Sequence, residues 1–230
     1  MSDSSGSRAT AFFRGQSLGL DSADGPRGAY VRFAKRGLDI VAACVFIAVF
    51  LPLIVILLLA ATSDGARPLF GHRRVGLDGR PFRCWKIRTM VPDAEARLAA
   101  LLASDLAARR QWETQRKLDR DPRITPLGHF LRRSSLDELP QLWNVLTGEM
   151  SIVGPRPVTR DELALYGDAA TQYTALRPGL TGLWQTVGRG RVSYAERVHM
   201  DRTYHDTVSF LLDLKILLRT ALVVCTRTGS

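Results

Sequence analysis

The chain has 230 residues, enough for one domain or one domain with a membrane anchor, and carries a formal net charge of +10 with an isoelectric point near 10.2. The excess of Lys and Arg predicts anionic partners: nucleic acid, acidic lipid headgroups or phosphorylated substrates. Nucleic acid is disfavoured, because the sequence has no zinc-finger spacing, no RNP-like aromatic motif and no basic zipper.

The cysteines and histidines limit the metal chemistry. Cys44, Cys84 and Cys225 are far apart in apolar or amphipathic surroundings, which predicts reduced thiols without a disulfide framework or a thiolate metal site. The four histidines form no zinc-binding pattern either. Any bound metal ion is therefore expected to be a hard cation held by oxygen.

Residues 1–32 are predicted to form a flexible tail, because they are rich in Ser, Gly, Ala and Asp and show no sustained periodicity. They do not resemble a secretory signal, since no basic stretch leads into an apolar run near the start.

Residues 33–63 are predicted to contain a membrane segment. Residues 38–61 are almost entirely apolar and lack the polar face of a soluble core helix, and roughly 20 such residues can cross a bilayer. Pro52, near the middle, removes one backbone donor and predicts a kink. Both flanks are basic, with Arg27, Arg32, Lys35 and Arg36 before the segment and Arg67, Arg73 and Arg74 after it. A spanning helix normally has positive charge on one side only, whereas a helix that bends and returns to the same face explains both flanks; the sequence leaves both topologies open.

Residues 64–230 are predicted to form the folded body. Asp78-Gly79 between two alternating runs predicts a β-hairpin within residues 67–90. In its second strand, Lys86 and Arg88 share one face, where they either point together at an anion or form a solvated surface.

The other elements are predicted to be mainly helical. Residues 93–117 read as one scaffold helix, and 127–133 as a short one. A further helix starts close to Asp137, because Pro140 is tolerated only within the first turn, and ends near Gly148. Residues 194–205 are also helical. The apolar segment 210–224 is interrupted by charges, which suits either an interfacial helix or a core helix.

Two adjacent acids, Asp137 and Glu138, follow the basic pair Arg132-Arg133. One interpretation is structural: Ser135 with Glu138 three residues later forms a capping box, and acids are favoured in a first turn. The other is chemical: guanidinium groups bind phosphate with a rigid fork of donors, and a metal ion or a covalent phosphoryl intermediate would bring acids to the same place.

Three loops present arginine between Gly and Pro. Arg156 lies between two prolines, Arg177 precedes Pro178-Gly179, and Arg189 lies between two glycines. Rigid turns hold a guanidinium in place for a diphosphate or carboxylate, and glycines let the main chain approach a ligand. Each loop is a weak signal; together with the acid pair they indicate a phosphate-handling site.

These features resemble the bacterial sugar transferases, small monotopic polyprenyl-phosphate phosphoglycosyl transferases. The resemblance runs from about Phe33 to the C-terminus and rests on Lys35-Arg36, the Pro-broken apolar segment, Lys86-Ile87-Arg88-Thr89-Met90, Leu136 to Leu142, Val153 to Pro157 and Arg177 to Gly182. Gly71 to Gly76, Arg116-Lys117-Leu118 and Gly182-Leu183-Trp184-Gln185 are similar to the branch that initiates exopolysaccharides with galactose- or glucose-1-phosphate.

The resemblance implies a fold of α/β type, mainly helical, with a re-entrant helix-break-helix in the inner (cytoplasmic) membrane and a catalytic domain, 64–230, on the cytoplasmic face. It implies that Asp137 attacks the β-phosphate of a UDP-sugar, that UMP leaves, and that polyprenyl phosphate then takes the phosphosugar. Glu138, with Asp137, would bind Mg²⁺, which offsets repulsion between anions.

By position, Arg132 is the candidate for holding a phosphate and Arg156 for holding the diphosphate, with Lys86, Arg177 and Arg189 as further candidates for substrate binding. The hexose is left open, with galactose favoured by the resemblance, and so is a homodimer. The rival function is a non-catalytic membrane adaptor whose basic loops bind acidic lipids, although an acid pair would repel such lipids.

Overall fold

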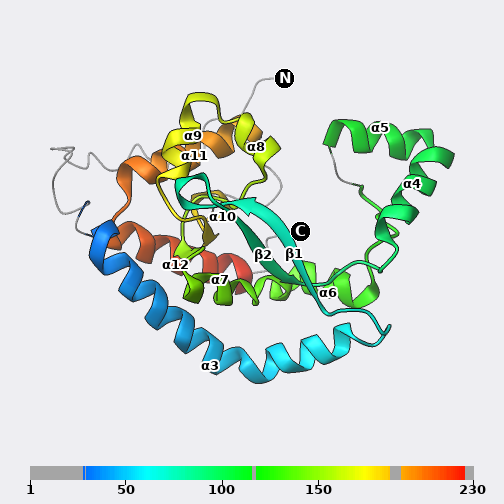
Figure 1. Cartoon of the computed structure of the whole chain (residues 1–230), viewed down its shortest axis with the longest axis horizontal. Helices are drawn as coiled ribbons and strands as arrows, with labels where there is room; N and C mark the ends of the chain where they lie inside the picture. The colour runs from blue at the N-terminus through cyan, green and yellow to red at the C-terminus, as the bar shows by residue number, and fades with distance from the viewer. Residues whose placement is uncertain (1–27, 29, 116–117, 187–192, 226–230) are drawn as a thin grey trace.

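The computed structural model describes residues 28, 30–115, 118–186 and 193–225. One long helix, α3 (Lys35–Ala61), follows a π-helical turn, η1 (Tyr30–Ala34), and curves along one side of the body (Figure 1). The helix continues through Pro52. Among the described residues it is the one helix long and apolar enough to cross a membrane.

The body contacts α3 near both of its ends. Lys35, Asp39 and Ala43 are buried at four-residue spacing near the start, and Leu57 and Ala61 near the end. Between them most apolar side chains are exposed, as at Val49 with 65% of its surface accessible. A soluble protein rarely exposes so continuous an apolar surface, which points to contact with lipid.

The predicted hairpin is confirmed. Strands β1 (Leu69–Val75) and β2 (Pro81–Ile87) pair antiparallel, in a register that runs from Leu69 opposite Ile87 to Val75 opposite Pro81. They are joined by the 3-10 turn η2 (Leu77–Gly79), in which Asp78 and Gly79 have φ of 56° and 74°. These left-handed conformations suit the Asp-Gly pair and the twist of the two strands.

A second, parallel pair was not predicted: β3 (Ser151–Val153) lies beside β4 (Gly179–Thr181). A Cβ atom on Gly179 would lie 2.1 Å from the backbone nitrogen of Gly154. Gly154 and Gly179 therefore allow main chain to pack on main chain, in place of the expected close approach to a ligand. The glycines beside Arg189 lie outside the described residues.

The remaining elements are helical, so the chain is a mainly helical α/β protein. In chain order they are α4 (Ala94–Ser104), α5 (Leu106–Gln115), α6 (Pro126–Ser134), η3 (Leu136–Glu138), α7 (Gln141–Thr147), α8 (Arg160–Ala164), η4 (Gly167–Ala169), α9 (Ala170–Thr174), α10 (Leu183–Thr186), α11 (Tyr194–Thr207) and α12 (Phe210–Cys225).

The single helix predicted over residues 93–117 is wrong, because the chain turns at Asp105. The backbone of Asp105 is extended, and its carboxylate accepts from the N–H groups of Ala107 and Ala108, at 2.8 and 3.0 Å, which starts α5 as a new helix. Helices α4 and α5 extend away from the rest of the body (Figure 1).

Asn144 joins α7 to the hairpin and so helps to place β2. Its side chain is fully buried, accepts a hydrogen bond from the backbone N–H of Trp85 at 3.0 Å and donates one to the carbonyl of Arg83 at 2.7 Å. These bonds satisfy backbone groups of β2 near Lys86.

Helix α12 combines the two alternatives left open by the sequence. Asp213 and Ile216 face the core, with 5% and 1% of their surface exposed. Leu211, Leu218 and Leu222 expose 59–66% of theirs on the other side. One face is a core face, and the other is an apolar surface suited to a membrane interface.

Candidate active site

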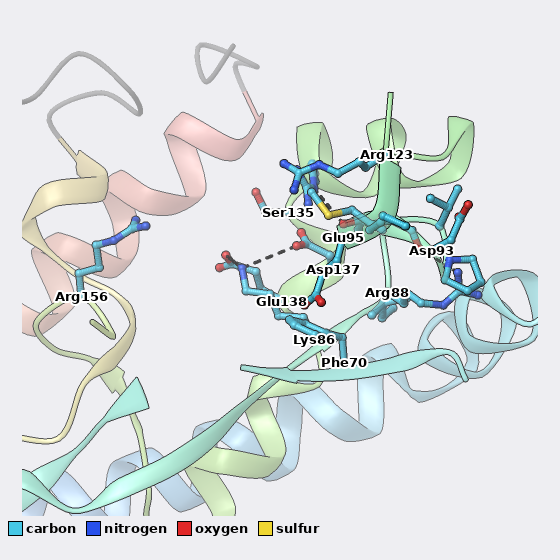
Figure 2. A pocket seen from close by; sticks show the side chains of 18 of the residues that line it. Phe70, Lys86, Arg88, Asp93, Glu95, Arg123, Ser135, Asp137, Glu138 and Arg156 are labelled. Carbon is cyan, nitrogen blue, oxygen red and sulfur yellow. Dashed lines mark hydrogen bonds and ion pairs between the residues drawn. The ribbon is translucent and has the colours of Figure 1, made fainter. Parts of the chain in front are cut away.

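A cavity of about 1050 Å³ lies between the end of β2, α4, α6, η3, α10 and α11. Its volume is at the upper end of the range for small-molecule sites. Lys86, Arg132, Asp137, Glu138 and Arg156, five of the residues predicted from the sequence, all line it. Figure 2 shows Asp137 and Glu138 on one side and Arg156 across the cavity from them.

The acid pair lies on the short 3-10 helix η3, between α6 and α7. The predicted capping box is wrong: Ser135 has a left-handed φ of 60°, and its side chain does not cap the turn. The predicted helix start close to Asp137 is wrong for the α-helix: α7 begins at Gln141 with Pro140 at its N-cap, and Asp137 lies in the preceding 3-10 turn. Because a non-glycine residue in this conformation is uncommon, the sharp turn at Ser135 is a locally strained feature beside the site.

Lys86 connects β2 to both acids. Its Nζ lies 2.7 Å from Glu138 Oε1 and 3.7 Å from Asp137 Oδ2. Burial raises the pKa of the Asp137 carboxyl, Lys86 opposes this, and the negative charge of Glu138 adds to it. Burial lowers the pKa of Lys86, but the two carboxylates outweigh it and the pKa of the ammonium is raised. The Lys86 cation therefore favours an ionised Asp137.

Two arginines of the cavity, Arg132 and Arg123, are held by bonds to neighbouring residues. Arg132 donates from Nε to the hydroxyl of Thr89 at 2.9 Å. Arg123, which also lines the cavity, is bound by Asp121 at 2.6 and 2.8 Å and stacks on Trp112 of α5 at 4.9 Å. Since Arg123 is already neutralised by Asp121, Arg132 is the better candidate for a phosphate on this side.

Arg156 approaches from the opposite wall. Its guanidinium carbon lies 4.8 Å from the centre of the Trp184 ring. Its backbone N–H donates to Asp201 at 3.4 Å, and the hydroxyl of Tyr166 donates to the same carboxylate at 2.7 Å. Trp184 and Arg197, which also line the cavity, were not predicted as site residues. A weak sequence signal existed: Arg197 precedes Asp201 by one helical turn on α11.

Two other arginines do not reach the acids. Arg177 is outside the set of residues that line the cavity, and its Nε donates to the carbonyl of Gly148 at 2.8 Å. Arg88 lines the cavity but is bound to Asp64 and to the carbonyl of Ala61 at the end of α3, so it does not join Lys86 in facing an anion. Arg189 lies outside the described residues.

The donor set fits magnesium only in part. No group of three or more His, Cys, Asp or Glu side chains that could hold a metal occurs within the described ranges. The two carboxylates of Asp137 and Glu138 nevertheless match the way Mg²⁺ is usually bound, through one or two carboxylates together with substrate phosphates and water.

Asp201 leads to a prediction about pH. Burial raises its pKa from 3.8 to about 7, opposed by its hydrogen bonds from Tyr166 and Arg156 and by the charge of Arg197. The folded protein therefore holds this proton more tightly than the unfolded chain does. The resulting stabilisation is fully present below the unfolded pKa and is lost as pH rises through about 7. Thermal unfolding should show stability falling by about 2–3 kcal/mol between about pH 5 and 8, and Asp201→Asn should flatten that slope.

The exposed acid Asp161 supplies the control, since Asp161→Asn should keep the wild-type slope. A slope that persists unchanged in Asp201→Asn would assign the pH dependence to another group.

The fold and the cavity together define a mainly helical α/β protein with a helix long and apolar enough for a membrane and a cavity lined by both carboxylates and guanidinium groups. The sequence model of the family described as "Bacterial sugar transferase" matches residues 30–227. The chain belongs to this family, as the resemblance indicated.

Named relatives support the assignment. The "Exopolysaccharide production protein ExoY" of Sinorhizobium fredii is 46% identical over 231 residues, covering both chains completely. The "Undecaprenyl-phosphate galactose phosphotransferase" of Salmonella typhimurium is 47% identical over 86% of this chain, which spans only 42% of that protein. The "UDP-glucose:undecaprenyl-phosphate glucose-1-phosphate transferase" of Caulobacter vibrioides is 42% identical over 83% of this chain and 69% of its own length.

Proposed function

We propose that this protein transfers a hexose-1-phosphate from a UDP-sugar to undecaprenyl phosphate, as the first step of exopolysaccharide synthesis. The observation that carries the proposal is the buried carboxylate of Asp137, which faces a cavity lined by Lys86, Arg132 and Arg156. The printed names of the Salmonella and Caulobacter relatives describe this class of transfer.

In the proposed first step, a carboxylate oxygen of Asp137 bonds to the β-phosphorus of the UDP-sugar. The bond from that phosphorus to the oxygen bridging the two phosphates breaks, and UMP leaves with the electron pair. In the second step, a phosphate oxygen of undecaprenyl phosphate bonds to the same phosphorus, and Asp137 leaves as a carboxylate. Splitting the transfer in this way replaces one difficult displacement by two easier ones.

The chain's own cations lower the barrier to both steps. Lys86 favours the ionised form of Asp137 against the effect of burial and limits the repulsion between the carboxylate and the incoming phosphate. Arg132 and Arg156 lie on different walls, so they suit different oxygens of the diphosphate.

We also propose that α3 is re-entrant and that the body lies on the cytoplasmic face. Near its start, Arg36 donates to the carbonyls of Val145 and Leu146, at 2.5 and 2.8 Å. At its end, Arg88 donates to the carbonyl of Ala61 at 2.7 Å. A helix that spans the bilayer would place its ends on opposite sides, whereas here one body binds both, which supports entry and exit at the same face.

Magnesium is proposed as the cofactor, with Glu138 and Asp137 as its protein ligands; when bound, it would neutralise charge on the diphosphate. Glu138→Gln should therefore raise the Mg²⁺ concentration needed for half-maximal UMP release by about ten-fold, since a neutral amide is a weaker ligand for a hard cation. Titrating Mg²⁺ against initial rate measures this. An unchanged midpoint would remove Glu138 from the metal site.

The test of the proposed function is UMP release from a panel of UDP-sugars by the purified protein with undecaprenyl phosphate. Release dependent on one UDP-hexose identifies the donor, which the relatives leave divided between galactose and glucose. A protein that binds acidic vesicles but releases no UMP from any sugar nucleotide would instead be a lipid-binding adaptor.

A further inference from the structure

One corner of the cavity holds hydrogen-bond donors that lack acceptors. The Nε atoms of Arg156 and Arg197 and the indole Nε1 of Trp184 are buried and have no hydrogen-bond partner among the described residues. All three side chains line the cavity. Buried donors without acceptors are rare in folded proteins, because burial removes their hydrogen bonds to water without replacing them. Since each of these atoms is a donor, the group that completes the corner must be rich in acceptors.

The corner is also positively charged and fixed in place. Arg156 stacks on Trp184, and Asp201 accepts from the backbone of Arg156, as described above. Within the described ranges, neither Arg156 nor Arg197 forms a salt bridge with a carboxylate. Burial and then the neighbouring charge of Arg156 lower the pKa of Arg197. An anion between the two guanidinium groups would relieve this repulsion and accept from both.

We propose that Arg156, Arg197 and Trp184 form a subsite for the phosphate of the nucleotide part of the donor, the group that leaves as UMP. The inference rests on the proposed function, because it takes Asp137 as the place where the β-phosphate reacts. Figure 2 shows Arg156 on the wall across from Asp137 and Glu138, so a donor that reaches the acids can extend toward this corner.

The alternative phosphate is that of the lipid acceptor, and the position of the corner argues against it. Helix α11, which carries Arg197, lies on the side of the body away from the long middle of α3 in Figure 1. That apolar stretch is where a polyprenyl chain would enter from the membrane. The corner therefore faces the end of the cavity that a water-soluble nucleotide reaches more readily.

The experiment measures binding of UMP and of geranyl phosphate, a short soluble stand-in for the acceptor, to the purified full-length protein by titration calorimetry. Arg197→Gln should weaken UMP binding about ten-fold or more, because a charge-assisted hydrogen bond to phosphate is lost. Trp184→Phe keeps a ring for Arg156 to stack on but removes the N–H, and should weaken it about three-fold. Both variants should bind geranyl phosphate like the wild type.

Arg202→Gln is the matched control, since it removes the same charge from an exposed position on the same helix and should leave UMP binding unchanged. Steady-state kinetics supply a second readout: KM for the UDP-sugar should rise in Arg197→Gln while KM for the lipid stays constant. Melting temperatures identify a misfolded variant, in which case Trp184→Phe decides.

Unchanged UMP affinity in folded Arg197→Gln and Trp184→Phe would overturn the proposal. Loss of geranyl phosphate binding in place of UMP binding would overturn it too, by assigning the corner to the acceptor. A wild-type protein that binds UMP through this corner but never releases UMP from a UDP-sugar would refute the proposed function and leave the subsite standing.

Discussion

Replacing Asp137 with asparagine is expected to abolish hexose-1-phosphate transfer, lowering UMP release by at least about a thousand-fold. The amide has nearly the shape of the carboxylate but cannot displace UMP from the β-phosphorus. Because burial raises the pKa of Asp137, the site already disfavours the charge, so the neutral variant should fold at least as stably as the wild type. Membrane association should persist, since α3 is unchanged.

The covalent step gives this prediction a direct readout. Wild-type protein incubated with UDP-sugar but without lipid acceptor should gain the mass of one phosphosugar, which peptide mapping should place on Asp137. Asp137→Asn should show no such adduct, whereas Asp161→Asn, which changes an exposed acid on α8, should react normally. Normal turnover by Asp137→Asn, or an adduct on a different side chain, would contradict the proposed mechanism.

Elements encoded by local patterns were predicted correctly. The hairpin follows from alternation around Asp78-Gly79, and the apolar helix from an unbroken apolar run, and neither depends on distant parts of the chain. The predicted break at Pro52 is not confirmed, because α3 continues through it as one helix. The parallel pairing of β3 with β4 joins segments that are far apart in the sequence and only three residues long, so no local period reveals it. The break at Asp105 was missed because its carboxylate competes with the helix by capping the next one, an effect that hydrophobic spacing does not register.

The site shows the same division. Asp137, Glu138 and Arg132 are close in sequence, and two prolines mark the rigid turn around Arg156. The sequence could therefore predict that these residues belong to one site. Arg177 carries the same type of signal but bonds to the carbonyl of Gly148, which ends α7. Arginines in Gly-Pro turns thus serve either to bind a ligand or to hold a chain end, and only tertiary contacts distinguish the two.

Trp184 and Arg197 were not predicted as site residues because their sequence signals are weak: Trp184 occurs in a family-like motif without an assigned role, and Arg197 only precedes Asp201 by one helical turn. They lie on two different helices, and their role emerges only because α10 and α11 bring them close to Arg156 at one cavity. The structure reveals them through three buried hydrogen-bond donors that have no acceptor among the described residues. Neither composition nor residue spacing carries this information.

A buried ion pair that ties the membrane helix to the body leads to the second large effect. Lys35 Nζ of α3 lies 2.5 Å from Asp213 Oδ2 of α12, and both side chains are at most 10% exposed. Tyr30 and Tyr204 also donate to this carboxylate, at 2.8 and 2.7 Å. Asp213→Leu would leave the Lys35 ammonium buried without its partner, and should destabilise the protein by about 3–5 kcal/mol.

The double variant Lys35→Met with Asp213→Leu separates the cost of an isolated charge from the net contribution of the pair. Because two apolar side chains of similar size can replace a buried pair at little cost, we expect it to recover at least about half of the lost stability. The two tyrosine hydroxyls still lose their acceptor, which limits the recovery. Thermal unfolding in detergent measures both variants, with Arg202→Met on the exposed face of α11 as control. Equal losses in the single and double variants would show that Lys35 and Asp213 are not energetically coupled, and that α3 is held to the body by its apolar contacts alone.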